Sequence, residues 1–134
     1  MSQHPVMRTD FPLSAVVAVI GIALPIYAFA ADPAQEAATA AVHAGLAAQA
    51  ATIEQVHMHL HHTVNCLAGP KGQGFDAKEA NPCQKLGDGA ITDTSDSATK
   101  AKLTAALAKA QAGLKSDDLT AAKAAATDTQ SALK

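Results

Sequence analysis

The feature that most constrains the fold is one long stretch, residues 33–67, in which almost nothing interrupts a helix. Asp32 is a suitable N-cap, and Pro33 suits the first helical position, where its missing N–H leaves no helical hydrogen bond unmade. Gly45 is the only residue inside the stretch that disfavours a helix strongly, by about 1 kcal/mol relative to alanine. Gly69, which a proline follows, ends the pattern. The sequence therefore predicts a single first helix over 33–67, on the order of 50 Å long.

Large apolar side chains follow one face of this predicted helix. The predicted stripe consists of Val42, Leu46, Ile53, Val56, Leu60, Val64 and Leu67. Four of its members recur every seven residues: Leu46, Ile53, Leu60 and Leu67. This is the spacing of a helix face that packs against other helices. We therefore expect this face to form the core side of the first helix.

Two further helices are predicted after an irregular segment. Residues 68–96 contain several glycines and prolines, which indicate a loop. Residues 97–115 and 117–133 carry leucine and alanine at helical spacing, with Ser116 as the cap of the last helix. The turn between them is short, so they are antiparallel neighbours unless they merge into one bent helix. The expected fold class is all-α, a long first helix plus an antiparallel helical hairpin that together form a three-helix bundle.

Cys66 and Cys83 are the only cysteines, and they flank the first part of the loop. In an oxidising compartment they suit one disulfide, which staples the loop to the end of the first helix. Closing a loop of this size stabilises a fold by roughly 3 kcal/mol in the chain-entropy model. A reduced Cys66 is a potential metal ligand instead, and the two roles exclude one another.

The start of the chain indicates the compartment. An apolar run covers 11–30, and Pro25 interrupts it near its end. The run closes on an Ala-Phe-Ala sequence that ends at Ala30 and matches the small-x-small rule for signal cleavage. We expect residues 1–30 to be a secretory signal peptide and 31–134 to be a single helical domain, located in the bacterial periplasm or secreted. The alternative is an uncleaved membrane anchor, because an apolar run of this length can span a bilayer.

The composition of the chain argues against several functions. Aromatic residues make up 3% of the chain, and beyond the signal segment the only one is Phe75. A chain so rich in alanine buries area only through close helix packing, so a deep catalytic cavity is not expected. The net charge is −2 and the lysines are scattered, which argues against nucleic-acid binding. The thin core favours a homodimer or a helical protein partner.

The chemistry of the chain is concentrated in one part of the predicted first helix. Four of the six histidines lie there within six residues, beside a methionine. The candidate ligands are Glu54, His57, Met58, His59, His61 and His62. At 100° per residue, His57 and His61 share one face with Glu54. His62 lies on a second face with Met58 and His59, so two chelating groups are predicted.

His43 lies on the flank of His57 and His61 but about three turns before them, which is too far to share an ion on a continuous helix. Imidazole binds copper, zinc and nickel, and a thioether such as that of Met58 favours Cu(I). Two histidines supply only two ligands, so Glu54, Met58, another helix or water must supply the rest. We predict a transition-metal site in this stretch, with copper favoured and zinc or nickel as alternatives.

Other interpretations accompany the metal site. The histidines can be structural groups of a non-catalytic protein-interaction module, bonded to a neighbouring helix or exposed to solvent. Non-covalent haem binding is a third interpretation, which the scarcity of aromatics disfavours; the Cys-x-x-Cys-His motif for covalent haem is absent. No enzyme is expected, because no serine or free cysteine is placed for attack beside a base such as His57.

An exported, alanine-rich helical chain with histidines four residues apart, such as His57 and His61, resembles the small helical metal-binding proteins of the bacterial periplasm. The resemblance covers the export signal and the helices with short capped turns, and it implies an all-helical fold and metal binding. Those proteins spread histidines along most helices, whereas this chain concentrates them at one helix end, which favours a single defined site over storage. The segment from His57 to Cys83 also resembles part of uncharacterised exported bacterial proteins.

Overall fold

The computed structural model of the protein describes residues 30–134, and within them the chain forms helices and loops only. The helices are α1 Pro33–Gln49, α2 Ile53–Ala68, α3 Ala90–Asp93, α4 Ser97–Leu114 and α5 Leu119–Leu133. The predicted all-α class is confirmed. The expected signal peptide, residues 1–30, lies outside the described residues except for its last position. None of the described helices has the length and apolarity that spanning a bilayer requires.

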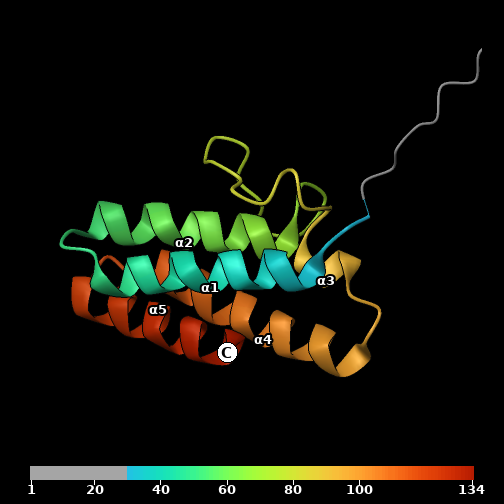
Figure 1. The fold of residues 1–134 in the computed structure, drawn as a ribbon. Helices are drawn as coiled ribbons and strands as arrows, with labels where there is room; N and C mark the ends of the chain where they lie inside the picture. The colour runs from blue at the N-terminus through green and yellow to red at the C-terminus, as the bar shows by residue number, and fades with distance from the viewer. Residues whose placement is uncertain (1–29) are drawn as a thin grey trace, which may run out of the picture.

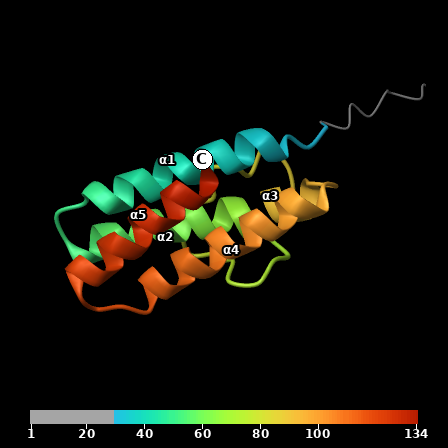
Figure 2. The same ribbon diagram turned by 90° about the horizontal axis from the view of Figure 1, so that it is seen from below.

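Four of the helices form an antiparallel bundle, which Figure 1 and Figure 2 show from two sides. α1 packs against α2 and α5, and α4 packs against the same two helices. The chain direction reverses from α1 to α2 and again from α4 to α5. The short helix α3 contacts α1, α2 and α4 at one end of the bundle. The expected antiparallel pair near the carboxyl end of the chain corresponds to α4 and α5.

The last helix begins two residues later than predicted, and Ser116 is not its cap. Asp118 is the N-cap of α5, and its carboxylate accepts a hydrogen bond from the Ala121 N–H at 2.7 Å. A carboxylate is favoured at this position because it also interacts with the positive end of the helix dipole. Ser116 instead belongs to the turn, where its hydroxyl accepts from the Asp118 N–H at 3.3 Å.

The single first helix predicted over 33–67 is wrong, because the chain divides there into α1 and α2. Ala50 is extended, with φ −62° and ψ 150°, so the chain leaves the helix at this residue. Thr52 then caps α2, and its hydroxyl accepts from the Gln55 N–H at 3.3 Å. The Gln55 side chain accepts in turn from the Ala51 N–H at 3.1 Å, which closes an arrangement like a capping box. The bundle therefore has four long helices rather than three.

Only the second half of the predicted apolar stripe is fully buried. On α2 the buried members are Val56, Leu60, Val64 and Leu67. On α1 the prediction is wrong, since Val42 and Leu46 are 60% and 43% exposed. The seven-residue register cannot continue through the break between the helices, so a different face of α1 turns inward. That face carries Glu36, Ala40, Ala44 and Ala47.

The core consists of two adjoining clusters along the bundle. One packs alanines of α1, α4 and α5 around the apolar residues of α2. The other surrounds the two cysteines, and Leu107 of α4 packs against both clusters. Every member of both clusters lies between Ala37 and Leu133. The helical domain therefore carries its own core, and its many alanines let the helices approach closely enough to exclude water without aromatic residues.

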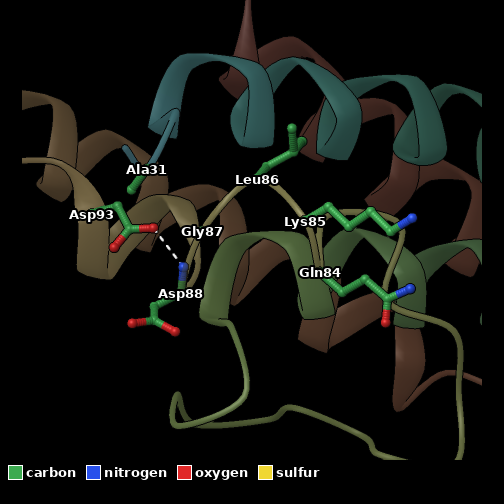
Figure 3. A pocket seen from close by; sticks show the side chains of 7 residues that line it. All are labelled: Ala31, Gln84, Lys85, Leu86, Gly87, Asp88 and Asp93. Carbon is green, nitrogen blue, oxygen red and sulfur yellow. Dashed lines mark hydrogen bonds between the residues drawn. The ribbon is translucent and has the colours of Figure 1, made fainter. Parts of the chain in front are cut away.

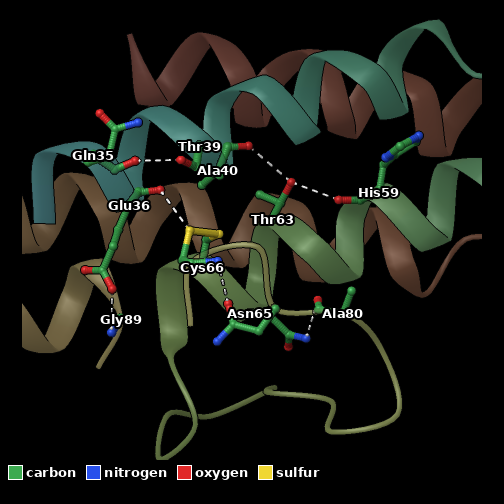
Figure 4. The surroundings of a disulfide bond; sticks show 12 residues. Gln35, Glu36, Thr39, Ala40, His59, Thr63, Asn65, Cys66, Ala80 and Gly89 are labelled. Atoms are coloured by element: carbon green, nitrogen blue, oxygen red, sulfur yellow. Dashed lines mark hydrogen bonds between the residues drawn. A yellow bond between two sulfur atoms is a disulfide. The ribbon is translucent and has the colours of Figure 1, made fainter. Parts of the chain in front are cut away.

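Cys66 and Cys83 form a disulfide, as predicted, with a Cα–Cα distance of 5.1 Å. Both cysteines are buried, and the bridge joins the end of α2 to the loop that follows it. The Cys83 Sγ atom lies 3.7 Å from the Glu36 carbonyl oxygen of α1, so the bridge is packed between helices (Figure 4). The disulfide thus holds the loop against the amino-terminal part of α1.

Asn65, next to the disulfide on α2, organises the part of the loop that the bridge encloses. Its side chain is fully buried. The amide nitrogen donates to the carbonyl oxygens of Asp76 at 3.0 Å and Ala80 at 3.1 Å, and the amide oxygen accepts from the Asp76 N–H at 2.9 Å. Figure 4 shows the bond to Ala80. The loop predicted over 68–96 is therefore held by side-chain bonds to its backbone, with α3 near its end.

Candidate metal centre

Three histidines from two helices converge between α1 and α2. His43 lies on α1, whereas His59 and His62 lie on α2 three residues apart, hence on one face. One ring nitrogen of each lies within 4.8 Å of those of the other two, and all three side chains are partly buried. The ring centroids of His43 and His62 are 4.9 Å apart. We call these residues the histidine triad. Within residues 30–134 no other group of three His, Cys, Asp or Glu side chains is placed so that it could hold a metal ion.

Small residues and one hydroxyl set the spacing of the two helices at the triad. Ala40 and Ala44, which flank His43 along α1, are fully buried and let α2 approach closely. Thr63 of α2 is also fully buried, and its hydroxyl lies 3.0 Å from the His59 carbonyl oxygen. The same hydroxyl lies 3.3 Å from the Ala40 carbonyl oxygen across the interface, as Figure 4 shows. A hydrogen bond shared between α1 and α2 therefore fixes their distance within one turn of the triad.

Two members of the triad are held in the neutral form. Burial lowers the pKa of His43, and the neighbouring rings of His62 and His59 lower it further. Burial also lowers the pKa of His62, and His59 adds to this decrease while Glu79 opposes it. A histidine must be neutral to bind a metal, because its ligand is the lone pair of a ring nitrogen. Both rings are therefore ready to act as ligands at neutral pH.

The spacing of His43 and His59 suits two ligands of a tetrahedral metal ion. The Nδ1 atoms of His43 and His59 are 3.4 Å apart. In a tetrahedral site with metal–nitrogen bonds of roughly 2.0–2.1 Å, two ligand nitrogens are about 3.3 Å apart. The Nδ1 atom of His62 is buried and has no hydrogen-bond partner among the described residues, so this ring has an unused ligand atom. Three imidazoles can occupy three corners and leave the fourth for another ligand.

Two of the ligands predicted from the sequence, His59 and His62, belong to the triad. The predicted pair His57 and His61 does not. His57 Nε2 donates a hydrogen bond to the Ser116 carbonyl oxygen at 2.9 Å, in the turn between α4 and α5. His61 Nδ1 lies 3.9 Å from a carboxylate oxygen of Asp76 in the loop. The two rings thus meet different segments of the chain, although they share one face of α2.

Glu54 and Met58, the remaining predicted ligands, both lie on the surface of α2. Glu54 is in the first turn, where bonds from its own backbone and from Thr52 lower the pKa of its carboxyl. Met58 is 39% exposed. It precedes His59 and lies one turn before His62, so Met58 is on the side of α2 that carries the triad.

The sequence interpretation placed His43 too far from His57 and His61 to share an ion with them, and the structure places His43 beside His59 and His62 instead. On a continuous helix it is turns away from the other histidines, but the reversal between α1 and α2 brings its ring to theirs. The available signal was the Thr52-x-x-Gln55 pattern, which is typical of a helix start. A hairpin centred on Ala51 places His43 eight residues before the turn and His59 eight residues after it, hence opposite one another.

Comparisons of the chain with protein-family models, with curated proteins and with solved structures found no match in any of the three. The chemistry of the triad is therefore the basis for assigning a function. Three partly buried imidazoles, two of them kept neutral, can hold a metal ion between α1 and α2.

Proposed function

We propose that this protein binds one transition-metal ion through the histidine triad, with copper favoured and zinc or nickel as alternatives. One observation carries the proposal: three ring nitrogens, supplied by two helices, lie within 4.8 Å of one another. Imidazole ligands suit all three metals. The competing interpretation is a polar network of histidines. The Nδ1 atom of His62 is free to bind a metal, but so is the Nδ1 atom of His61 outside the triad, so the convergence of the three rings is what favours a metal site.

Met58 is the reason to favour copper. Met58 is next to His59 and one turn before His62 on α2, and thioethers are soft ligands that prefer Cu(I). With Met58 in the fourth position, three nitrogens and one sulfur enclose the ion. A site closed by four protein ligands holds a metal rather than activating a water, so the proposed role is metal binding or handling and not catalysis.

We also propose that the protein works outside the cytoplasm, in the bacterial periplasm or as a secreted protein. The Cys66–Cys83 disulfide supports this, because disulfides persist in oxidising compartments. The signal-like pattern of residues 1–30 supports it as well. One defined site in such a protein is suited to taking up and passing on a metal ion rather than to storing many.

Calorimetric titration of oxidised residues 31–134 with Cu(II) and Zn(II), together with a chelator competition for Cu(I), tests the proposal. We expect one ion per chain. His43→Ala should weaken binding by more than about 100-fold, since loss of a direct ligand exceeds the effect of outer-shell changes. The matched control is the double variant His57→Ala and His61→Ala, which should bind almost unchanged. Loss of binding in this control but not in His43→Ala would move the site to the other face of α2, and no binding by the parent chain would end the proposal.

A second candidate function is a protein-interaction module. Val42, Leu46 and Met58 are large apolar side chains that stay exposed, and all three are within one turn of a triad histidine. An apolar surface of this kind suits a helical partner or a second copy of the chain. Sedimentation of the parent and of a Val42→Ser, Leu46→Gln variant measures this. Association that weakens in the variant would support the module, and a parent that stays monomeric at all concentrations would exclude a homodimer.

A further inference from the structure

Glu36 places a carboxyl group inside the helical bundle. It lies on the buried face of α1 and is 0% exposed. Its Oε1 atom accepts a hydrogen bond from the Gly89 N–H at 3.0 Å, as Figure 4 shows. Its Oε2 atom is buried and has no hydrogen-bond partner among the described residues. An ionised carboxylate is strongly unfavourable in such a place, so either a proton or a cation must neutralise it.

A second carboxyl group makes the charge on Glu36 still less favourable. Burial raises the pKa of Glu36 to about 7, in spite of the opposing bond from Gly89. The Asp93 carboxyl, through its charge and a hydrogen bond to the Glu36 side chain, and the Asp32 carboxyl contribute to the increase. The Asp93 carboxylate itself accepts a hydrogen bond from the Asp88 N–H at 2.6 Å. Two acidic side chains are thus held side by side by backbone amides of one loop.

The beginning of the described chain meets this carboxyl pair at Gly87. A methyl group added to Gly87 would lie 3.0 Å from Ala31 Cβ and 3.1 Å from Glu36 Oε1, and it would overlap the Asp93 carboxylate. Ala31 and Asp93 also line one pocket of about 480 Å³, which Figure 3 shows. The Asp32 N–H donates to the Leu86 carbonyl oxygen at 2.8 Å, which anchors the chain just after Ala31.

No side-chain cation of residues 30–134 pairs with these carboxyls. Neither Glu36 nor Asp93 forms a salt bridge with a lysine within the described part of the chain. Lys85 lines the same pocket, but its side chain points away from Asp93 (Figure 3). The other charged groups around the pair, Asp32 and Asp88, are acidic and add to the need for a positive charge.

We propose that the α-ammonium group of Ala31, released by cleavage after Ala30, binds the Glu36–Asp93 carboxyl pair and locks the start of the mature chain onto the bundle. The inference rests on the proposed export and cleavage. Hydrolysis of the Ala30–Ala31 peptide bond by a signal peptidase consumes one water and leaves a carboxylate on Ala30 and an ammonium on Ala31. The amide of an uncleaved chain is neutral, so only the processed chain has a cation at Ala31, whose side chain lies beside Gly87 and lines one pocket with Asp93.

Chains prepared by cleaving a fusion protein in vitro test the lock whether or not cells cleave at this bond. One chain begins at Ala31, and the other carries Gly-Ser-Gly before Ala31, which moves the amine about 10 Å away. At pH 7.5 the first should unfold roughly 4–8 °C above the second. This difference in unfolding temperature (the gap between the two chains) should vanish at pH 10, where an α-amine is neutral. NMR titration of the α-amine should give a pKa above its ordinary value of about 8 in the first chain only.

Substitutions of the carboxyls decide whether the gap arises from the proposed pair. The gap should be lost in Glu36→Gln or, if that variant does not fold, in Asp93→Asn, and it should persist in the control Asp128→Asn on the exposed side of α5. Equal unfolding temperatures of the two unsubstituted chains, or a gap that survives both carboxyl variants, would overturn the proposal. Amino-terminal sequencing of the exported protein tests the cleavage separately, so failure of the lock and failure of the processing are distinguishable.

Discussion

The Nδ1 atoms of His43 and His59 lie 3.4 Å apart, although the residues are 16 positions apart in the sequence and belong to different helices. The contact exists because the chain reverses at 50–52, midway between them. An ion bound by the triad therefore joins α1 to α2 and stabilises the folded hairpin, since the ligands come together only in the folded state. The proposed metal binding is therefore coupled to folding through this one turn.

Metal binding should withstand acid better than binding by ordinary histidines. Burial lowers the pKa of His43 and His62 below the ordinary value of 6.5, so protons compete with a metal for these rings only below that pH. His43 and His62 should therefore stay neutral in the metal-free protein down to about pH 6.5, which NMR titration of the two rings between pH 8 and pH 5 measures. Protonation of either ring that begins well above pH 6.5 would contradict its lowered pKa.

The same two rings should make the metal-free protein sensitive to acid. Because the pKa of His43 and of His62 is lower in the folded than in the unfolded chain, their contribution to stability is complete above pH 6.5. It is lost as the pH falls through the lowered values of the folded state. Urea unfolding between pH 8 and pH 5 measures this loss, and a His43→Ala, His62→Ala chain should show less of it than the parent.

Thr52→Ala should lower the free energy of unfolding by about 1 kcal/mol, because it removes the N-cap of α2. The matched control is Thr127→Ala on α5, where the exposed hydroxyl donates to the Lys123 carbonyl oxygen and caps nothing. The control should change stability by less than about 0.5 kcal/mol. Thr52→Ala should also weaken zinc binding, because the cap lies in the turn that brings the triad together. Equal effects of the two substitutions in urea unfolding and zinc titration would argue against this role of Thr52.

Removing the disulfide should lower the stability of the fold but leave zinc binding unchanged. A Cys66→Ala, Cys83→Ala chain should lose roughly 3 kcal/mol of unfolding free energy, because its unfolded state is no longer restricted by the bridge. Zinc stoichiometry at low temperature should stay at one per chain, since the triad contains no cysteine. Loss of the bound ion from a variant that circular dichroism shows to be folded would mean that the loop contributes a ligand.

Asn65→Ala should release the loop that the disulfide encloses. Three bonds of about 3 Å join its buried side chain to the backbone of Asp76 and Ala80. Their loss should lower stability by about 2–3 kcal/mol and speed amide exchange over residues 76–80. Asn81→Ala is the control, because that side chain makes a single bond of 3.0 Å, to the Cys83 N–H. A loop that exchanges equally in both variants would show that Asn65 does not organise it.

Much of the fold was predictable because its signals are local. The apolar spacing and the cap of α4 depend on residues that are close together in the sequence. The disulfide was predictable because two cysteines can form only one pair. The buried face of α2 followed from its valines and leucines. The buried face of α1 did not, since it is made of alanines and Glu36, which no hydrophobic pattern distinguishes from a surface.

The site was only half predictable. His59 and His62 lie on one turn of one helix, so their proximity follows from helical geometry alone. His43 depends on where the chain reverses, and the weak signal at Thr52 was outweighed by the apparent continuity of the apolar stripe. His57 and His61 share a face as predicted, yet they meet different segments of the chain.

The sequence by itself therefore determined that the chain is helical, that its cysteines pair and that most of its potential metal ligands lie in one segment. Only the tertiary structure decided which histidines form the candidate site and that α1 supplies one of them. The physical reason is that caps, propensities and spacing act over a few residues, whereas a site that joins two helices depends on the packing that follows a turn. The turn at 50–52 lets the alanine face of α1 pack closely against α2.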